Sequence, residues 1–167
     1  MKYFGLILIL TCSFLIGYQI KSSFTKRVSQ LEKCIEMLEL ISINLSYISL
    51  DTVSILEMLI NSDNLKEISF IDICLNLVNR GNNFYNSWNE ALNSAEMYLK
   101  PQDKDILLSF GAMLGKSDID GQIRNCEIGI QKLSVNLNKA KEQRDKYANL
   151  YFRLSIFSGI LISLIII

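Results

Sequence analysis

Two charge-free apolar segments, one near each end of the chain, place the strongest limit on how this sequence can fold. Residues 3–20 read YFGLILILTCSFLIGYQI, and residues 154–167 read LSIFSGILISLIII. Eighteen helical residues extend about 27 Å, which is close to the thickness of the hydrocarbon core of a bilayer. The second segment reaches the same length when residues 150–152 are included, because Arg153 can extend its guanidinium to the headgroups. We therefore expect a transmembrane helix at each end of the chain.

Each apolar segment also allows other interpretations. The first could be a cleaved signal peptide, although it is long for one and no small-x-small cleavage motif follows it. It could also be a lipoprotein signal ending at Cys12, although Thr11 stands where a smaller residue is usual and the apolar run continues. The second segment could be a buried terminal helix, although three consecutive isoleucines end it. Two retained anchors remain the preferred interpretation.

Basic residues beside the two segments predict the topology. The first segment is followed by Lys21, Lys26, Arg27 and Lys33, and the second is preceded by Lys139, Lys141, Arg144, Lys146 and Arg153. Cytoplasmic flanks of membrane spans are enriched in lysine and arginine, so the central part is expected in the cytoplasm and both termini outside it. The predicted division is an anchor at residues 1–21, a cytoplasmic domain at residues 22–150 and a second anchor at residues 151–167.

The central part shows helical periodicity throughout. One apolar seam alternates steps of four and three residues: Phe24, Val28, Leu31, Ile35, Leu38, Ser42 and Leu45. A second seam of the same kind runs through Ile119, Ile123, Cys126, Ile130, Leu133, Leu137, Ala140, Arg144, Tyr147, Tyr151 and Leu154, interrupted only by Arg144. Such seams are typical of helices that pack in bundles or coiled coils. Both long helices must meet the membrane on one side, so we expect them to be antiparallel neighbours.

Local start and stop signals divide the central part into about six helices. The expected ranges are 24–50, 52–61, 65–80, 84–98, 101–114 and a long helix from residue 118 into the second anchor. Asp51 and Asp118 suit N-caps, Pro101 suits a first helical turn, and Gly81 and Gly115 suit C-terminal stops. The predicted fold class is all-α, an antiparallel helical bundle between N- and C-terminal transmembrane helices.

The residue inventory argues against catalysis. The chain has no histidine, which removes the commonest acid–base residue and metal ligand. Its four cysteines, Cys12, Cys34, Cys74 and Cys126, are too widely spaced for a CxxC metal or redox motif, and we expect them to be buried and reduced. No phosphate-loop, nucleophile-elbow or dinucleotide motif is present. We expect no enzymatic activity, no cofactor, no metal and no small-molecule substrate.

The charge balance argues against a nucleic-acid partner. Seventeen basic and seventeen acidic residues give a formal net charge of zero. Nucleic-acid binders usually carry a basic excess or stripe. Asp118 and Asp120 could be paired carboxylates, but residues two apart on a helix point in different directions, and capping by Asp118 is the simpler interpretation. Arg144 is expected to pair with Glu142 or Asp145, or to snorkel.

Two features remain candidates for contact with a protein partner. The polar turn at residues 114–118 lies between two expected helices at the end of the domain away from the membrane, and it could be a docking surface or only a connection. Trp88 could anchor a partner, although core packing in a small bundle is the commoner role for tryptophan.

These residues resemble stage III sporulation protein AB of endospore-forming bacteria. The stretch FGAMLGKSD at residues 110–118, followed by Gln122, is similar to the family's FGxxLGxxD…Q pattern before a long charged helix. Trp88 with Ala-Leu three residues later, and Gly159 in the hydrophobic tail, also match. The resemblance covers essentially the whole chain. Two residues depart from the family pattern. Gly121 stands where a better helix former is expected, and Ser155 stands near the place of a second glycine in the tail.

The resemblance implies a role and partners that the residues alone do not give. The family resembles the cytoplasmic domain of inner-membrane platform proteins of type II secretion and type IV pilus systems. It implies a non-enzymatic assembly component of a channel between mother cell and forespore. The membrane would be the forespore membrane facing the mother-cell cytoplasm. The implied partners are a co-encoded cytoplasmic ATPase and the other membrane proteins of the channel. Candidate contact residues are Lys116, Ser117, Asp118, Asp120, Gln122 and Trp88.

Two other function classes compete with this assembly role. A membrane-bound helical signalling or scaffold protein unrelated to sporulation is the first, although a sensor is expected to carry an extracytoplasmic ligand domain. An integral-membrane enzyme is the second, although it needs ionisable residues within the spans. The two apolar segments offer little beyond serine, threonine and glutamine, with Arg153 flanking the second.

Overall fold

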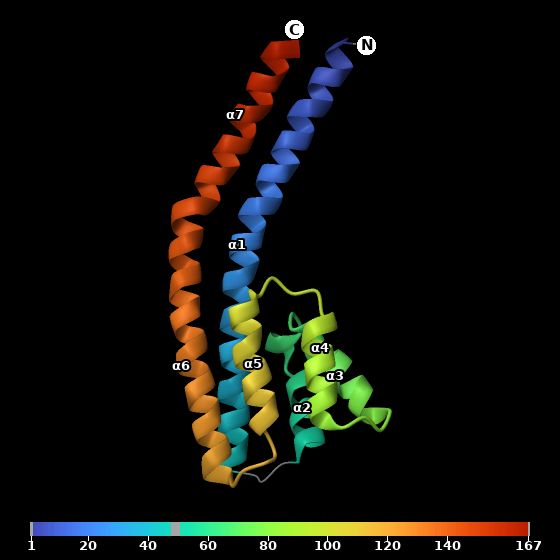
Figure 1. Cartoon of the computed structure of the whole chain (residues 1–167), viewed down its shortest axis with the longest axis vertical. Coiled ribbons are helices and arrows are strands. Elements are labelled where there is room, and N and C mark those ends of the chain that lie inside the picture. Colours follow the sequence, from blue (N-terminus) through green and yellow to red (C-terminus); the bar gives the residue numbers. More distant parts are fainter. Residues whose placement is uncertain (1, 48–50, 167) are drawn as a thin grey trace. The chain divides into compact units, whose positions relative to one another are not determined.

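The computed structural model describes residues 2–47 and 51–166, which are helical along most of their length. The elements, in order, are α1 (Lys2–Tyr47), α2 (Thr52–Ile60), the 3₁₀ helix η1 (Asp63–Leu65), α3 (Ser69–Asn79), α4 (Phe84–Ser94), α5 (Pro101–Met113), α6 (Ile119–Gln143), the π-helical segment η2 (Arg144–Ala148) and α7 (Asn149–Ile166) (Figure 1). The described residues form no strand, which confirms the all-α class.

The chain packs as two units. Unit 1 comprises Met1–Val28 and Asn138–Ile167, and unit 2 comprises Ser29–Leu137. The boundaries between them fall inside α1 and α6. The predicted membrane boundaries, after residue 21 and before residue 151, stay a prediction, because packing between helices and contact with lipid are separate properties.

Unit 1 is a pair of antiparallel helices. The rings of Phe14 and Phe152 lie 5.6 Å apart between centroids, and those of Phe24 and Tyr151 stack at 6.3 Å. Further along, Arg27 Nη1 donates a hydrogen bond of 3.2 Å to Gln143 Oε1. As residue numbers rise along α1, the residue numbers of the side chains that contact it fall, so the two helices run in opposite directions. The expected antiparallel arrangement therefore holds within this unit. The beginning of α1 and the end of α7 therefore lie at the same end of the pair (Figure 1).

Most apolar side chains of this pair are exposed. Two helices of the described chain, within Ile7–Tyr47 and Ile119–Ile165, are long and apolar enough to cross a membrane. Only 6% and 11% of their most apolar stretches are buried, whereas the core helix of a soluble protein is mostly buried. This exposure favours lipid contact over a soluble core. Cys12 is also exposed, contrary to the expected burial, because two helices side by side cover only one face of each other.

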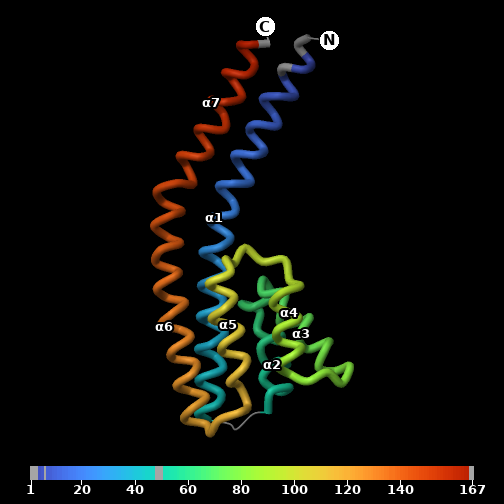
Figure 2. Tube along the Cα trace, in the orientation of Figure 1, coloured from blue at the N-terminus to red at the C-terminus, as the bar shows by residue number. Residues whose placement is uncertain are grey.

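Unit 2 contains a packed core between the later part of α1, the elements α2 to α5 and the first part of α6 (Figure 2). Its largest fully buried side chains include Trp88, Phe70 and Phe110. On α1 the fully buried stripe runs through Leu31, Cys34, Leu38 and Ile41. The predicted seam residues Ile35 and Ser42 lie at the edge of this stripe, half-buried. A helix inside a multi-helix core needs a wider apolar face than a two-helix seam.

Helix α6 approaches α1 closely within unit 2. A Cβ added at Gly129 would lie 2.7 Å from Leu38 Cδ1, so no larger residue fits there without movement. The buried polar residue Asn136 donates from Nδ2 to Asp103 Oδ1 at 2.8 Å. Asp103 also accepts the backbone N–H of Lys100 at 2.9 Å, and this contact closes a capping box at the start of α5. These contacts fix α5 between its neighbours.

The predicted start and stop signals are confirmed where the structure describes them. Asp51 Oδ1 accepts the Ser54 N–H at 3.2 Å and caps α2. Gly81 and Gly115 have φ of 91° and 76°, the left-handed region in which side chains are strained. Pro101 begins α5. The predicted end of the first helix near Leu50 lies outside the described residues.

Two predicted helix boundaries and the regularity of the last helix differ from the structure. Helix α3 begins at Ser69 instead of residue 65, and α4 ends at Ser94 instead of residue 98. Leu65, Ile68 and Ala95 are buried although they lie outside these helices. Their apolar spacing matched the helical pattern, and for this reason the predicted helices were too long. The long last helix also contains the π-helical segment η2, although no proline or glycine within it marks an irregularity in the sequence. Within it, Arg144 pairs with Asp145 at 2.9 Å, one of the expected partners.

Candidate functional site: the turn between α5 and α6

The turn at residues 114–118 is held by its own backbone. Leu114 N–H donates to Phe110 O at 3.1 Å, and Lys116 N–H donates to Met113 O at 3.1 Å. Gly115 takes the left-handed conformation between these two bonds. The chain therefore reverses direction in a few residues and enters α6 at Ile119.

Asp118 caps α6. Its Oδ1 accepts the Gly121 N–H at 3.1 Å, and its backbone oxygen accepts the Gln122 N–H at 3.0 Å. A Cβ added at Gly121 would lie 2.6 Å from that carboxylate oxygen, which gives a local reason for this glycine. Asp120 is exposed in the first turn of the helix, where the helix dipole favours a negative charge. Capping, the simpler interpretation of Asp118, is confirmed.

Gln122 ties the turn to the helix that follows it. Its Oε1 accepts the Gly115 N–H at 3.1 Å, and its Nε2 donates to Ser117 O at 3.0 Å. One side chain thus satisfies both a donor and an acceptor of the turn backbone. Such a double contact stabilises this conformation of the turn.

Lys116 lies on the surface of the turn. It is exposed, and its Nζ lies 5.1 Å from the centroid of the Tyr85 ring, a cation–π arrangement. Ser117 is half-buried, and its Oγ has no hydrogen-bond partner among the described residues. A surface hollow of about 210 Å³ adjoins the turn and is lined by Thr52, Asn83, Phe84, Tyr85, Gly111, Leu114, Gly115 and Lys116.

Trp88 lies in the core and not on this surface. It is 1% exposed, and its Nε1–H donates to Leu107 O at 2.9 Å. The rings of Phe70, Phe84 and Phe110 surround it at centroid distances of 5.0, 5.6 and 5.9 Å. The structure therefore places five of the six candidates in or directly after one turn and assigns Trp88 to packing.

Sequence reasoning missed Tyr85 and Thr52 as neighbours of the turn. They come from α4 and α2, which are distant along the chain, so only the fold brings them to the hollow. Tyr85 is exposed, and an aromatic residue two positions after the helix-capping Asn83 was the available signal in the sequence.

The cysteines of unit 2 are expected to be unreactive at neutral pH. Burial raises the pKa of Cys34, Cys74 and Cys126 from the ordinary 9.0 to about 12, and Asp103 adds to the effect at Cys34. A thiol with so high a pKa is protonated at neutral pH and is a poor nucleophile and ligand. No group of three or more histidine, cysteine or acidic residues suited to a metal occurs in the described part of the chain.

The family model of stage III sporulation protein AB matches residues 2–167. The chain belongs to the stage III sporulation protein AB family. This membership gives it a sporulation-related role and fits a membrane location. No curated protein and no solved structure matches the chain.

The stretch that carries the family resemblance is explained by the fold of this turn. Phe110 and Leu114 are buried, and Gly111 leaves room for Trp88, because an added Cβ would lie 2.3 Å from Trp88 Cδ1. Gly115 supplies the left-handed turn, Asp118 the cap and Gln122 the bridge. In this member of the stage III sporulation protein AB family, the motif builds a rigid turn and leaves Lys116 and Asp120 at the surface.

Proposed function

We propose that the chain is a non-enzymatic, membrane-anchored assembly component of a channel complex between mother cell and forespore. The observation that carries this proposal is the combination of an exposed apolar helix pair in unit 1 with a packed helical unit 2. An assembly role asks for a fixed position in the membrane and a stable binding surface. The three buried thiols of unit 2 and the lack of a histidine fit such a role.

Small residues at the helix contacts support anchoring of unit 1 in lipid. A Cβ added at Gly17 would lie 2.9 Å from the Ser155 Cβ, and one added at Gly159 would lie 2.7 Å from the Ser13 Cβ. Each helix thus places a small-xxx-small pair against the other. In membranes, where water does not drive apolar helices together, small residues allow the close backbone approach that stabilises helix pairs.

The distribution of basic residues supports a cytoplasmic location for unit 2. Lys21 and Arg153 bound the two apolar segments, and Lys21 Nζ lies 5.6 Å from the ring centroid of Phe152, the neighbour of Arg153. The two helices therefore carry a positive charge at the same level. By the positive-inside rule this level faces the cytoplasm, which in the proposed complex is that of the mother cell.

The turn between α5 and α6 is the proposed docking surface for the co-encoded cytoplasmic ATPase. It exposes Lys116, Asp118 and Asp120 on a backbone held by Gln122. A rigid surface loses little entropy when a partner binds. Charged residues at the rim of an interface chiefly set specificity and association rate, so a reversed charge is expected to repel the partner.

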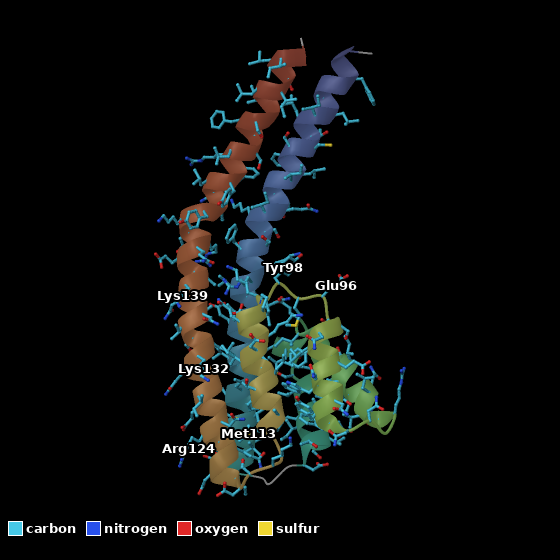
Figure 3. All side chains as sticks on the ribbon, viewed as in Figure 1. Glu96, Tyr98, Met113, Arg124, Lys132 and Lys139 are labelled. Atoms are coloured by element: carbon cyan, nitrogen blue, oxygen red, sulfur yellow. The ribbon has the colours of Figure 1, made fainter. Side chains whose placement is uncertain are left out.

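Co-purification of the ATPase with the full chain in detergent tests this proposal. Lys116→Glu is expected to reduce the recovered ATPase several-fold, whereas Lys132→Glu, an exposed lysine of α6 outside the turn, is expected to leave it unchanged (Figure 3). Circular dichroism of both variants checks that the fold is retained. Equal recovery from the wild type and both variants would remove the turn as the docking surface, and no recovery from the wild type would remove this partner.

A further inference from the structure

The formal net charge of zero conceals a strong separation of charge between the two units. Within the bounds of unit 1 the sequence has nine lysines and arginines against two acidic residues, a formal net charge of +7. Within unit 2 it has eight lysines and arginines against fifteen acidic residues, a formal net charge of −7. A basic excess is therefore present, but only in the unit that also carries the apolar segments.

Eight of the nine basic residues of unit 1 form what we call the basic belt. They are Lys21, Lys26, Arg27, Lys139, Lys141, Arg144, Lys146 and Arg153. Arg27 is buried against Gln143, and Arg144 pairs with Asp145. Lys21, Lys139, Lys146 and Arg153 are exposed. All eight lie on the side of the apolar segments that faces the cytoplasm in the proposed topology.

A surface hollow of about 210 Å³ lies within the belt. It is lined by Lys139, Glu142, Gln143, Lys146 and Tyr147. Lys146 Nζ lies 5.3 Å from the Tyr147 ring centroid, and both residues belong to the π-helical segment η2. A π segment widens one helical turn and changes the direction of the side chains that follow, and such segments are frequent at functional sites. The hollow thus combines two ammonium groups with one carboxylate, one amide and one phenol.

This set of groups suits an anionic headgroup that also carries hydroxyls. A phosphate diester can accept hydrogen bonds from Lys139 and Lys146, which donate only. Glu142 accepts hydrogen bonds, so it would repel a second negative charge and favour a hydroxyl donor beside the phosphate. Phosphatidylglycerol has this combination of one phosphate and two hydroxyls. A choline headgroup offers neither a net negative charge nor a hydroxyl.

We propose that the basic belt binds anionic phospholipid, with the hollow between Lys139 and Lys146 as its principal headgroup site. The inference rests on the proposed membrane anchoring, because the apolar segment that begins at residue 150 holds Lys146 about 6 Å beyond the span, within reach of the headgroups, while Lys139 lies further out on the same helix. Clusters of lysine and arginine beside a membrane span attract anionic lipid electrostatically. The belt then selects the lipids around the protein as well as orienting it.

Electron paramagnetic resonance of spin-labelled lipids tests the proposal on the full chain. The protein is reconstituted in phosphatidylcholine vesicles with a trace of spin-labelled phosphatidylglycerol or spin-labelled phosphatidylcholine. Lipids next to a membrane-spanning protein give a motionally restricted spectral component. We expect the relative association of phosphatidylglycerol to exceed that of phosphatidylcholine by about threefold or more, and to approach equality in about 1 M NaCl, at which charges are screened beyond about 3 Å.

Paired variants locate the headgroup site. Lys139→Gln combined with Lys146→Gln is expected to remove most of the preference for phosphatidylglycerol. Lys116→Gln combined with Lys132→Gln removes the same charge from exposed lysines of unit 2 and is expected to leave the preference unchanged. A preference that survives the first pair would overturn the hollow as the site.

The wild-type spectra separate failure of this inference from failure of the anchoring proposal. A restricted component of equal size for both lipids would overturn lipid selection while retaining a membrane-spanning chain. The absence of a restricted component for either lipid would overturn anchoring itself, and lipid selection with it.

Discussion

Gly159 of α7 lies directly against Ser13 of α1, so that a Cβ at residue 159 would be 2.7 Å from the serine Cβ. Gly17 faces Ser155 in the same way, at 2.9 Å. The serine at residue 155, one of the departures from the family pattern, is thus a small residue at a close helix contact. These two contacts make the spacing of the helix pair in unit 1 depend on side-chain size.

Enlarging either glycine of the pair should separate the two helices. We expect Gly17→Leu and Gly159→Leu each to cost about 1–3 kcal/mol of pair stability, the usual range for overpacking. Gly5→Leu is the matched control, because nothing lies within 4 Å of a Cβ added there. Oxidative crosslinking of Phe14→Cys with Phe152→Cys, in a Cys12→Ser background, reports pairing. Equal crosslinking in all three leucine variants would contradict the close contact.

The Trp88 ring should need the space beside Gly111, so that a side chain at residue 111 is not tolerated. A Cβ at residue 111 would lie 2.3 Å from Trp88 Cδ1, and the indole is held by its hydrogen bond to Leu107 O. We expect Gly111→Ala to destabilise unit 2 by about 1–3 kcal/mol, although alanine is the better helix former. Urea denaturation followed by tryptophan fluorescence measures this. A stability equal to or above that of the wild type would show that the core can move aside.

The bridge made by Gln122 should contribute to stability, whereas Lys116 should not. We expect Gln122→Ala to cost about 1–2 kcal/mol, because it leaves the Gly115 N–H and Ser117 O without their partner. Asp118→Ala should cost about 1 kcal/mol as a lost N-cap. Lys116→Glu should change stability by about 0.5 kcal/mol or less, since Lys116 is exposed. Thermal denaturation in parallel compares them. A larger cost for Lys116→Glu than for Gln122→Ala would reverse these assignments.

The fragment of residues 22–150 should fold without the apolar segments and shield its thiols. Cys34, Cys74 and Cys126 are buried, so a thiol reagent at neutral pH should react with none of them until denaturant is added. Because their pKa is raised from 9.0 to about 12, the unfolded state loses these protons first as pH rises. Stability is therefore expected to be unaffected by these groups below about pH 9 and to fall between about pH 9 and pH 12.

Rapid labelling of three thiols in the native fragment would contradict the packed core. A fragment that shows no helical circular dichroism would instead mean that unit 2 depends on the apolar segments. Cys34→Ala should reduce the alkaline loss of stability, which separates the thiols from other groups that titrate at high pH.

Both termini should lie outside the cytoplasm. A cysteine added after Ile167, in a Cys12→Ser background, is expected to react with a membrane-impermeant maleimide applied to intact, non-sporulating cells that express the chain in their cell membrane, because the basic belt marks the cytoplasmic side. A Lys116→Cys variant is the matched control and should react only after the cells are opened. Protection of the C-terminal cysteine, with an N-terminal cysteine still labelled, would make α7 a cytoplasmic helix.

The sequence by itself determined the properties that depend on neighbouring residues. Helix starts and stops at Asp51, Gly81, Pro101 and Gly115 follow from backbone conformation and local hydrogen bonds, which a few adjacent residues decide. The apolar segments and the all-α class follow from composition and periodicity along the chain. The hydrogen bonds of the turn at residues 114–118 also belong to this local level.

Only the tertiary structure decided which distant residues meet. Apolar spacing continued through Leu65 and Ala95, yet both lie outside helices, because burial depends on packing and not on helical conformation. The contact of Gly111 with Trp88, the hollow beside the turn and the pairing of Gly17 with Ser155 each join separate helices. The basic belt is of the same kind: a net charge of zero along the chain becomes +7 in unit 1, because folding brings residues 1–28 together with residues 138–167.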